Sequence, residues 1–70
     1  MNKKIYVDGM TCGHCASHVK EALTDIGAYK VVVDLDENIV IADVDEEVGD
    51  DEIKSAIEDA GYDVVDIEEA

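Results

Sequence analysis

Apolar and polar residues alternate at the start of the chain, and this alternation predicts a strand over residues 3–8. Ile5 and Val7 fall on the face that would be buried. The alternation returns over residues 28–35, and strand-forming residues resume over 39–44 after a short polar turn. The last two segments therefore predict a β-hairpin.

Two other stretches carry apolar residues at helical spacing. The first predicts a helix over about residues 14–26, and Gly27 follows where a C-terminal cap is expected. The second predicts a helix over about residues 50–60, preceded by acids that complement the helix dipole and offer capping oxygens. Gly61 ends this helix, and residues 62–67 supply a fourth strand.

The predicted order of elements is β-α-β-β-α-β, which defines the fold class as α+β. It is typical of the ferredoxin-like sandwich, in which a four-stranded antiparallel sheet carries two helices on one face. The chain has 70 residues, enough for one small domain that spans residues 1–70. Because Phe and Trp are absent, the core must be aliphatic, and it is expected to form without metal.

The charge of the chain excludes several classes of partner. Five lysines, no arginine and nineteen acidic residues give a formal net charge of −14. Nucleic acids and anionic membrane surfaces are not expected partners, since both need clustered basic residues. No segment approaches the roughly 20 apolar residues of a membrane span, so we expect no membrane insertion and a cytoplasmic location. The acidic surface is interpreted first as solubilising, and alternatively as steering a basic partner toward the chain.

The candidate chemistry lies where the first strand meets the first helix. Cys12 and Cys15 are the only cysteines of the chain, and residues three apart on a helix share a face. Thiolates select Cu(I), Zn(II) and similar ions, and a helix N-terminus stabilises thiolates. Two thiolates suffice for Cu(I), whereas a structural zinc site takes four ligands.

These residues carry a family resemblance. The sequence Gly-Met-Thr-Cys-x-x-Cys over residues 9–15, in its strand-to-helix context, and Ala-Gly-Tyr at residues 60–62 are similar to the heavy-metal-associated domain family. That family comprises small copper chaperones and the N-terminal domains of copper-transporting P-type ATPases. The resemblance covers essentially the whole chain. It implies that Cys12 and Cys15 bind a soft metal and that the protein is a carrier, not an enzyme.

The resemblance also implies a route of transfer. Cu(I) would pass by thiolate exchange to a copper-transporting P-type ATPase or to a related metal-binding domain. The carrier is expected to be a monomer, with a copper-bridged dimer as the alternative. The position of Met1 before the first strand and the end at Ala70 favour a complete small protein over a piece of a transporter.

Five neighbours of the cysteines are candidates for a role at the site. Met10 is expected to pack inward, as the matching Met does in the family, and Thr11 to act as a local cap. Zinc-preferring relatives often carry Asp at the position of Thr11, so the resemblance favours copper. His14 and His18 are candidate third ligands, but His14 is expected to face solvent and to tune the thiols or contact a partner. Tyr62 either shields or hydrogen-bonds the site, or packs with its hydroxyl in water.

Two alternatives remain open. A mercury-binding or zinc-binding domain of the same fold would also use Cys12 and Cys15, so Zn(II) and Hg(II) stand beside Cu(I). The sequence Cys-Gly-His-Cys also occurs in protein disulfide isomerases. A thiol-disulfide oxidoreductase is therefore the second alternative. The second alternative is disfavoured because thioredoxin-like folds are longer, have Trp before the first cysteine, and need a cis-proline that this chain lacks.

Overall fold

Four strands and two helices make up the computed structural model, which describes residues 1–70. In chain order they are β1 (Asn2–Asp8), α1 (Gly13–Asp25), β2 (Tyr29–Asp34), β3 (Ile39–Asp43), α2 (Asp50–Asp59) and β4 (Asp63–Glu69). Each element predicted from the sequence is present, and no boundary differs from its prediction by more than two residues. Neither helix combines the length and the apolar composition that crossing a bilayer requires.

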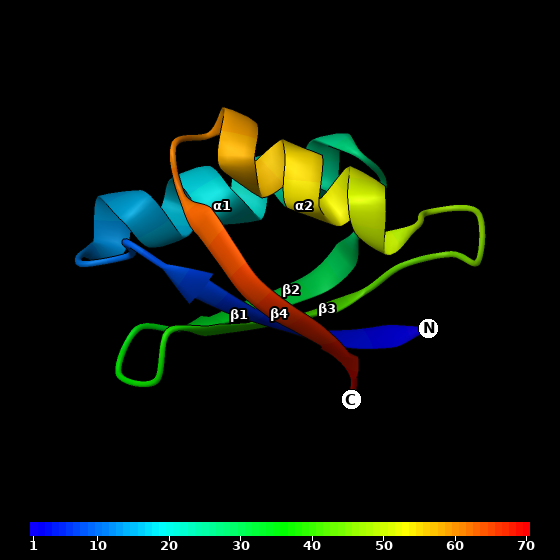
Figure 1. The fold of residues 1–70 in the computed structure, drawn as a ribbon, viewed down its shortest axis with the longest axis horizontal. Coiled ribbons are helices and arrows are strands. Elements are labelled where there is room, and N and C mark those ends of the chain that lie inside the picture. The colour runs from blue at the N-terminus through cyan, green and yellow to red at the C-terminus, as the bar shows by residue number, and fades with distance from the viewer.

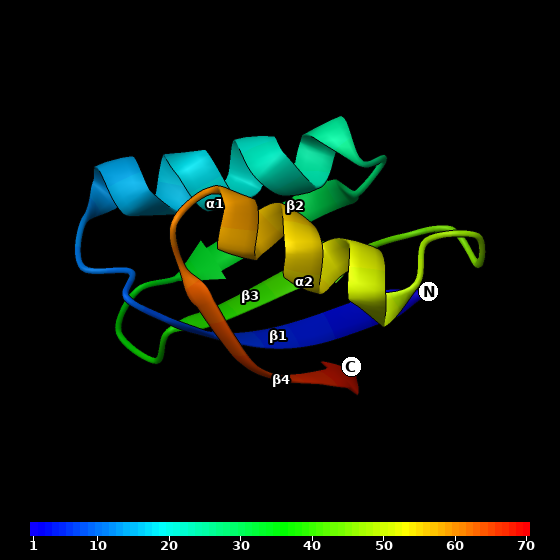
Figure 2. The same cartoon turned by 45° about the horizontal axis from the view of Figure 1, so that its top comes forward.

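The strands form one antiparallel sheet in the order β2-β3-β1-β4. Strand β1 therefore lies inside the sheet, where Ile5 pairs with Val40 on one side and with Ile67 on the other. Both helices cover the same face of the sheet, as the two views in Figures 1 and 2 show. The predicted α+β, ferredoxin-like βαββαβ sandwich is confirmed.

The core between the sheet and the helices is aliphatic, as the composition predicts. It contains eleven buried residues, which are Ile5, Val7, Met10, Val19, Leu23, Ala28, Val40, Ala42, Val44, Ile53 and Ile57. They come from both helices, from the inner face of β1 and β3, and from the loops that join these elements. The alternation in β1 and the helical spacing in α1 and α2 thus produce one shared apolar layer.

A glycine stands at each end of α2. Gly49 is the N-cap and no side chain caps the helix, so the capping role expected for the acids before Ile53 is wrong. Asp50, Asp51 and Glu52 lie instead in the first turn, where their charges complement the helix dipole. After the helix, Gly61 adopts φ +100, and the N–H of Tyr62 donates to the carbonyl of Ile57 at 3.2 Å.

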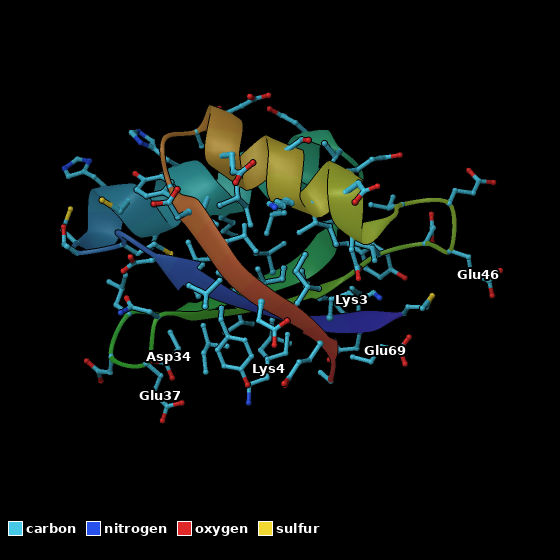
Figure 3. The ribbon with its side chains drawn as sticks, viewed as in Figure 1. Lys3, Lys4, Asp34, Glu37, Glu46 and Glu69 are labelled. Carbon is cyan, nitrogen blue, oxygen red and sulfur yellow. The ribbon has the colours of Figure 1, made fainter.

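Lys3 is a buried cation that no pattern in the sequence predicts. It lies on the core face of β1 with Ile5, and the side chain is 10% exposed. Its Nζ lies 3.2 Å from Oδ1 of Asp50 and 3.9 Å from Oε1 of Glu69. Figure 3 labels Lys3 and Glu69 at the end of the sheet. The alkyl stem of Lys3 therefore extends the apolar layer, while its charge ties β1 to α2 and β4.

The other face of the sheet is open to solvent. Lys4 and Tyr6 point away from the helices, and Nζ of Lys4 lies 5.4 Å from the centroid of the Tyr6 ring. The hydroxyl of Tyr6 donates a hydrogen bond to Glu68 at 3.0 Å. Figure 3 also shows Asp34 and Glu37 on the side away from the helices. Part of the negative charge of the chain therefore lies on the solvent-exposed face of the sheet.

A pair of identical substitutions tests where the core lies. Val40 is fully buried on β3, whereas Val32 on the neighbouring β2 is 61% exposed. We expect Val40→Ala to lower the free energy of unfolding by about 1.5–3 kcal/mol, because it removes buried methyl groups and leaves a cavity. Val32→Ala should cost less than about 1 kcal/mol. Urea unfolding followed by circular dichroism measures both, and equal losses would contradict this assignment of the two faces.

Candidate metal centre

The loop between β1 and α1 is fixed by a glycine and a buried methionine. Gly9 adopts φ +99, a left-handed conformation that only glycine reaches without strain, and it turns the chain at the end of β1. Met10 is 3% exposed and belongs to the core. The predicted inward packing of Met10 is therefore observed, and its side chain anchors the loop to the core.

The loop and the helix bring the two thiols together. Cys12 is the N-cap of α1 with extended backbone angles (φ −155, ψ 174), and the N–H of Ala16 donates to its carbonyl. Cys12 is exposed, whereas Cys15 is half-buried and packs against the core. Their Sγ atoms lie 3.7 Å apart and form no disulfide. With metal–sulfur bonds of about 2.3 Å, two sulfurs on one ion lie at most about 4.6 Å apart, so this pair fits a single ion.

Hydrogen bonds at the loop favour the thiolate form of Cys15. Its pKa is lowered from the ordinary 9.0 to about 6, mainly by the backbone N–H of Thr11 and next by the hydroxyl of Tyr62, with a smaller contribution from Cys12. Burial opposes these donors. Hydrogen bonds to the charged form always lower the pKa of an acid. Cys15 is therefore ready to bind a metal at neutral pH without first losing a proton.

The low pKa of Cys15 also links folding to pH. The thiol of an unfolded chain would titrate near the ordinary 9.0, so between about pH 6 and pH 9 the unfolded state holds a proton that the folded state has lost. The contribution of Cys15 to stability is thus complete above about pH 9, and it is lost as the pH falls through about 6.

Tyr62 takes part in the site through its hydroxyl. The hydrogen bond to Cys15 is the main cause that raises the pKa of Tyr62, followed by burial and by the charges of Cys15 and Cys12. Tyr62 therefore keeps its proton and donates it toward the sulfur. Its ring packs against the core and lies under Gly9, where an added Cβ would meet Cδ1 at 3.6 Å. The shifts of both pKa values support the alternative in which Tyr62 hydrogen-bonds near a sulfur, and this role of Tyr62 stays a prediction.

The role predicted for Thr11 as a local cap is wrong. The N-cap of α1 is Cys12, and no side chain caps this helix. Thr11 stands one residue too early, since a capping hydroxyl must come from the N-cap residue to reach the free N–H groups of the first turn. The backbone of Thr11 instead contributes the hydrogen bond that does most to lower the pKa of Cys15, and any residue except proline can supply it. No feature of the sequence could have revealed that donor.

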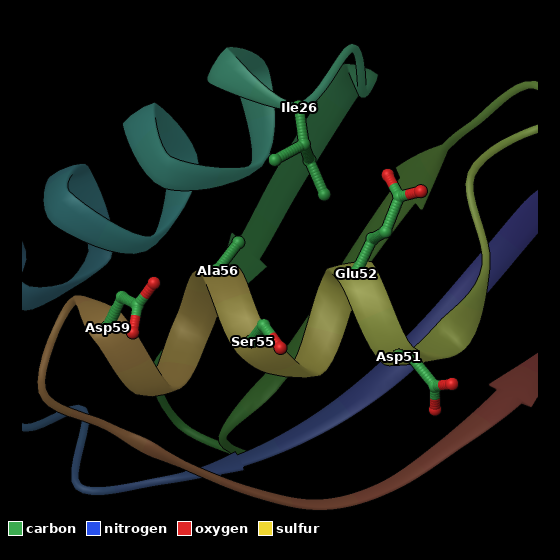
Figure 4. Close-up of a pocket in the computed structure, with 6 residues that line it drawn as sticks. All are labelled: Ile26, Asp51, Glu52, Ser55, Ala56 and Asp59. Carbon is green, nitrogen blue, oxygen red and sulfur yellow. The ribbon is translucent and has the colours of Figure 1, made fainter.

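No third ligand joins the two cysteines in the structure. His14 and His18 are both exposed on α1, and no three His, Cys, Asp or Glu side chains are grouped closely enough to hold an ion. The largest groove, of about 340 Å³, lies elsewhere, between α2 and the end of α1. Figure 4 shows its lining, which consists of Ile26, Asp51, Glu52, Ser55, Ala56 and Asp59. The dithiol thus sits in an exposed loop and not in a cavity.

A βαββαβ sandwich with a free dithiol at its first loop defines a small metal-binding domain. Comparison with known proteins agrees with that class. The model of the heavy-metal-associated domain family matches residues 4–63. The chain belongs to the heavy-metal-associated domain family.

Individual relatives cover nearly the whole chain. The copper chaperone CopZ of Staphylococcus haemolyticus is 48% identical over 66 residues, which is 91% of this chain and 97% of that protein. A solved structure of a CopZ metallochaperone has a TM-score of 0.87 at 40% identity and covers 93% of this chain and 100% of its own. The yeast copper transporter domain CCC2A, solved in apo and Cu(I) states, has a TM-score of 0.82 at 33% identity, with 90% of this chain and 89% of that chain covered.

Replacing the hydroxyl of Tyr62 tests the hydrogen bond to the thiolate. Tyr62→Phe keeps the ring in the core but removes the donor, so we expect the pKa of Cys15 to rise from about 6 toward 9.0 without reaching it, because Thr11 still donates. The pH dependence of the rate of alkylation of the thiols measures the change. Tyr6→Phe is the matched control, since its hydroxyl bonds Glu68 on the open face of the sheet. An unchanged thiol pKa in Tyr62→Phe would contradict the assigned donor.

Proposed function

We propose that this chain is a cytoplasmic Cu(I) carrier in which Cys12 and Cys15 bind the ion. The single observation that supports the proposal most strongly is the pair of free thiols, 3.7 Å apart, in an exposed loop anchored to the core. Residues 1–70 act as one heavy-metal-associated domain. The ion is the cargo of this domain and not a cofactor for catalysis, and we propose no enzymatic activity.

The donor set favours Cu(I) over other metals. Soft thiolates select Cu(I), whereas a structural zinc site closes a tetrahedron of four ligands, and only two cysteines converge here. The similarity to staphylococcal copper chaperones and to a yeast domain solved with Cu(I) supports the same metal. Zn(II) and Hg(II) are the competing cargoes, and the test below includes both.

The geometry of the loop supports transfer rather than storage. Cys12 is exposed, so an incoming thiolate from a partner can reach the ion while both cysteines still hold it. A bond from the partner's sulfur to copper forms, a bond to one cysteine of this chain breaks, and no electron is transferred. Because the pKa of Cys15 is about 6, its sulfur leaves as a thiolate at neutral pH and needs no proton donor.

We propose a copper-transporting P-type ATPase, or a related metal-binding domain, as the partner. Similarity to a copper-binding domain from HMA7, a P-type ATPase, supports this choice, with a TM-score of 0.84 at 34% identity. Two related dithiol domains can share one ion between their cysteines during the exchange. The net charge of −14 favours a partner with a basic docking face. We propose a monomeric carrier, with a copper-bridged dimer as the competing state.

Competition between metals tests the proposal. The reduced protein is mixed anaerobically with Cu(I), Zn(II) and Hg(II), and native mass spectrometry reads which ion it holds and in what stoichiometry. We expect one Cu(I) per chain. Cys12→Ser and Cys15→Ser should each weaken Cu(I) binding by more than about 100-fold. Loss of a residue that only hydrogen-bonds a ligand already lowers metal affinity by about 10–100-fold, and loss of the ligand itself should cost more.

Controls in the same experiment separate the alternatives. Ser17→Ala alters an exposed residue of α1 next to the site and should leave the affinity unchanged. Retention of full Cu(I) affinity in both cysteine variants would refute the assigned ligands. Preferential uptake of Zn(II) or Hg(II) would assign the site to another metal. Absence of binding together with disulfide-exchange activity would favour the oxidoreductase.

A further inference from the structure

A second pair of metal-ligating side chains lies on the first helix. His14 and His18 both fall within α1, Gly13–Asp25, and are separated by four residues. Residues at this spacing on a helix are neighbours on one face, with Cβ atoms about 5–6 Å apart. Both histidines are exposed, so their imidazole rings are free to turn toward a common ion. They are the only two histidines of the chain.

This spacing suits chelation by two imidazoles. Two histidines one helical turn apart bind zinc in the helical motif of metalloproteases, and imidazole also suits Cu(II) and Ni(II). A second ligand on the same rigid helix makes the second bond intramolecular, which raises the affinity well above that of a single histidine. No third side chain joins the pair in the structure, so water would fill the remaining positions around the ion.

The histidine pair is separate from the dithiol. Cys15 is half-buried and packs against the core, whereas His14 and His18 are both exposed on α1. The two sets of ligands also differ in chemistry, because thiolates prefer soft ions and imidazoles prefer borderline divalent ions. The two sets share no ligand, but Cys15 lies three residues before His18 on the same helix, so a test of the histidine pair has to remove both thiols.

Two electrostatic effects act on a cation at this position. The N-terminal end of α1 is the positive end of the helix dipole and weakly opposes a bound cation. The net charge of −14 attracts it, and Glu21 lies one further turn along from His18 on the exposed side of the helix. Lys20 is the only lysine of α1. The charge of the chain thus favours a divalent cation here.

We propose that His14 and His18 form a second metal site, which binds a borderline divalent ion such as Zn(II), Ni(II) or Cu(II) beside the dithiol. The proposal does not depend on copper transport, since it uses neither cysteine. It places an ion with open coordination positions on the exposed surface of α1, next to the loop that presents the thiols.

The test uses Ni(II) as the probe and removes the competing thiols. In the 70-residue chain carrying both Cys12→Ser and Cys15→Ser, titration calorimetry at about pH 7.5 should show one Ni(II) site. Adding His14→Ala or His18→Ala should weaken binding about tenfold or more. Paramagnetic broadening of amide signals should be centred on the first two turns of α1.

A matched control tests the spacing itself. His18→Ala combined with Lys20→His keeps two histidines on the same helix but moves the second to a different face, and it should bind no better than His18→Ala alone. Wild-type protein with both thiols alkylated repeats the titration without the serine substitutions. Equal Ni(II) affinity with and without His18→Ala would overturn the proposal, and so would full affinity in the His18→Ala, Lys20→His variant. Broadening centred on the acidic residues 45–47, before α2, would also overturn it.

Discussion

The dithiol loop is held at both ends by the aliphatic core. Met10 enters the core before the cysteines, and Cys15 packs against it after them. That core exists because one face of the sheet must be covered, and the apolar faces of α1 and α2 cover it. Only residues 11–14 lie between these two anchors, so packing of Met10 and Cys15 restricts where both sulfurs can lie.

Local hydrogen bonds decide the ionisation of the site against the charge of the whole chain. The net charge of −14 disfavours a thiolate, but exposed charges more than about 8–10 Å away are largely screened by salt. The hydrogen bonds from Thr11 and Tyr62 act locally, and they lower the pKa of Cys15 to about 6. The acidic surface and the reactive thiolate therefore coexist. The surface acts on partners at long range, and the loop acts on the metal at short range.

The sequence predicts most of this fold because its signals are periodic. Alternation places Ile5 and Val7 inside, and two glycines mark the ends of the helices. What it does not predict depends on contacts between segments that are distant in the sequence. Alternation puts Lys3 on the same face as Ile5, but its charge is paired there by Asp50 and Glu69, and no local pattern reveals those ion pairs.

The sequence likewise predicts some features of the candidate metal site and not others. The spacing of Cys12 and Cys15 predicts their convergence, since it is a property of one helical turn. The hydroxyl of Tyr62 could only be offered as one of two alternatives, because its approach to Cys15 depends on how β4 enters the sheet. The prediction that Thr11 caps α1 is wrong because the pattern of apolar residues locates a helix start only to within one or two residues. The identity of the N-cap depends on the backbone angles of a single residue, here Cys12.

X-ray absorption at the copper edge of the Cu(I)-loaded, reduced protein identifies and counts the atoms bound to the ion. We expect a Cu(I) centre with two sulfur neighbours, supplied by Cys12 and Cys15, and no nitrogen neighbour from His14 or His18. A first shell that contains nitrogen, or a single sulfur, in the monomeric protein would contradict it.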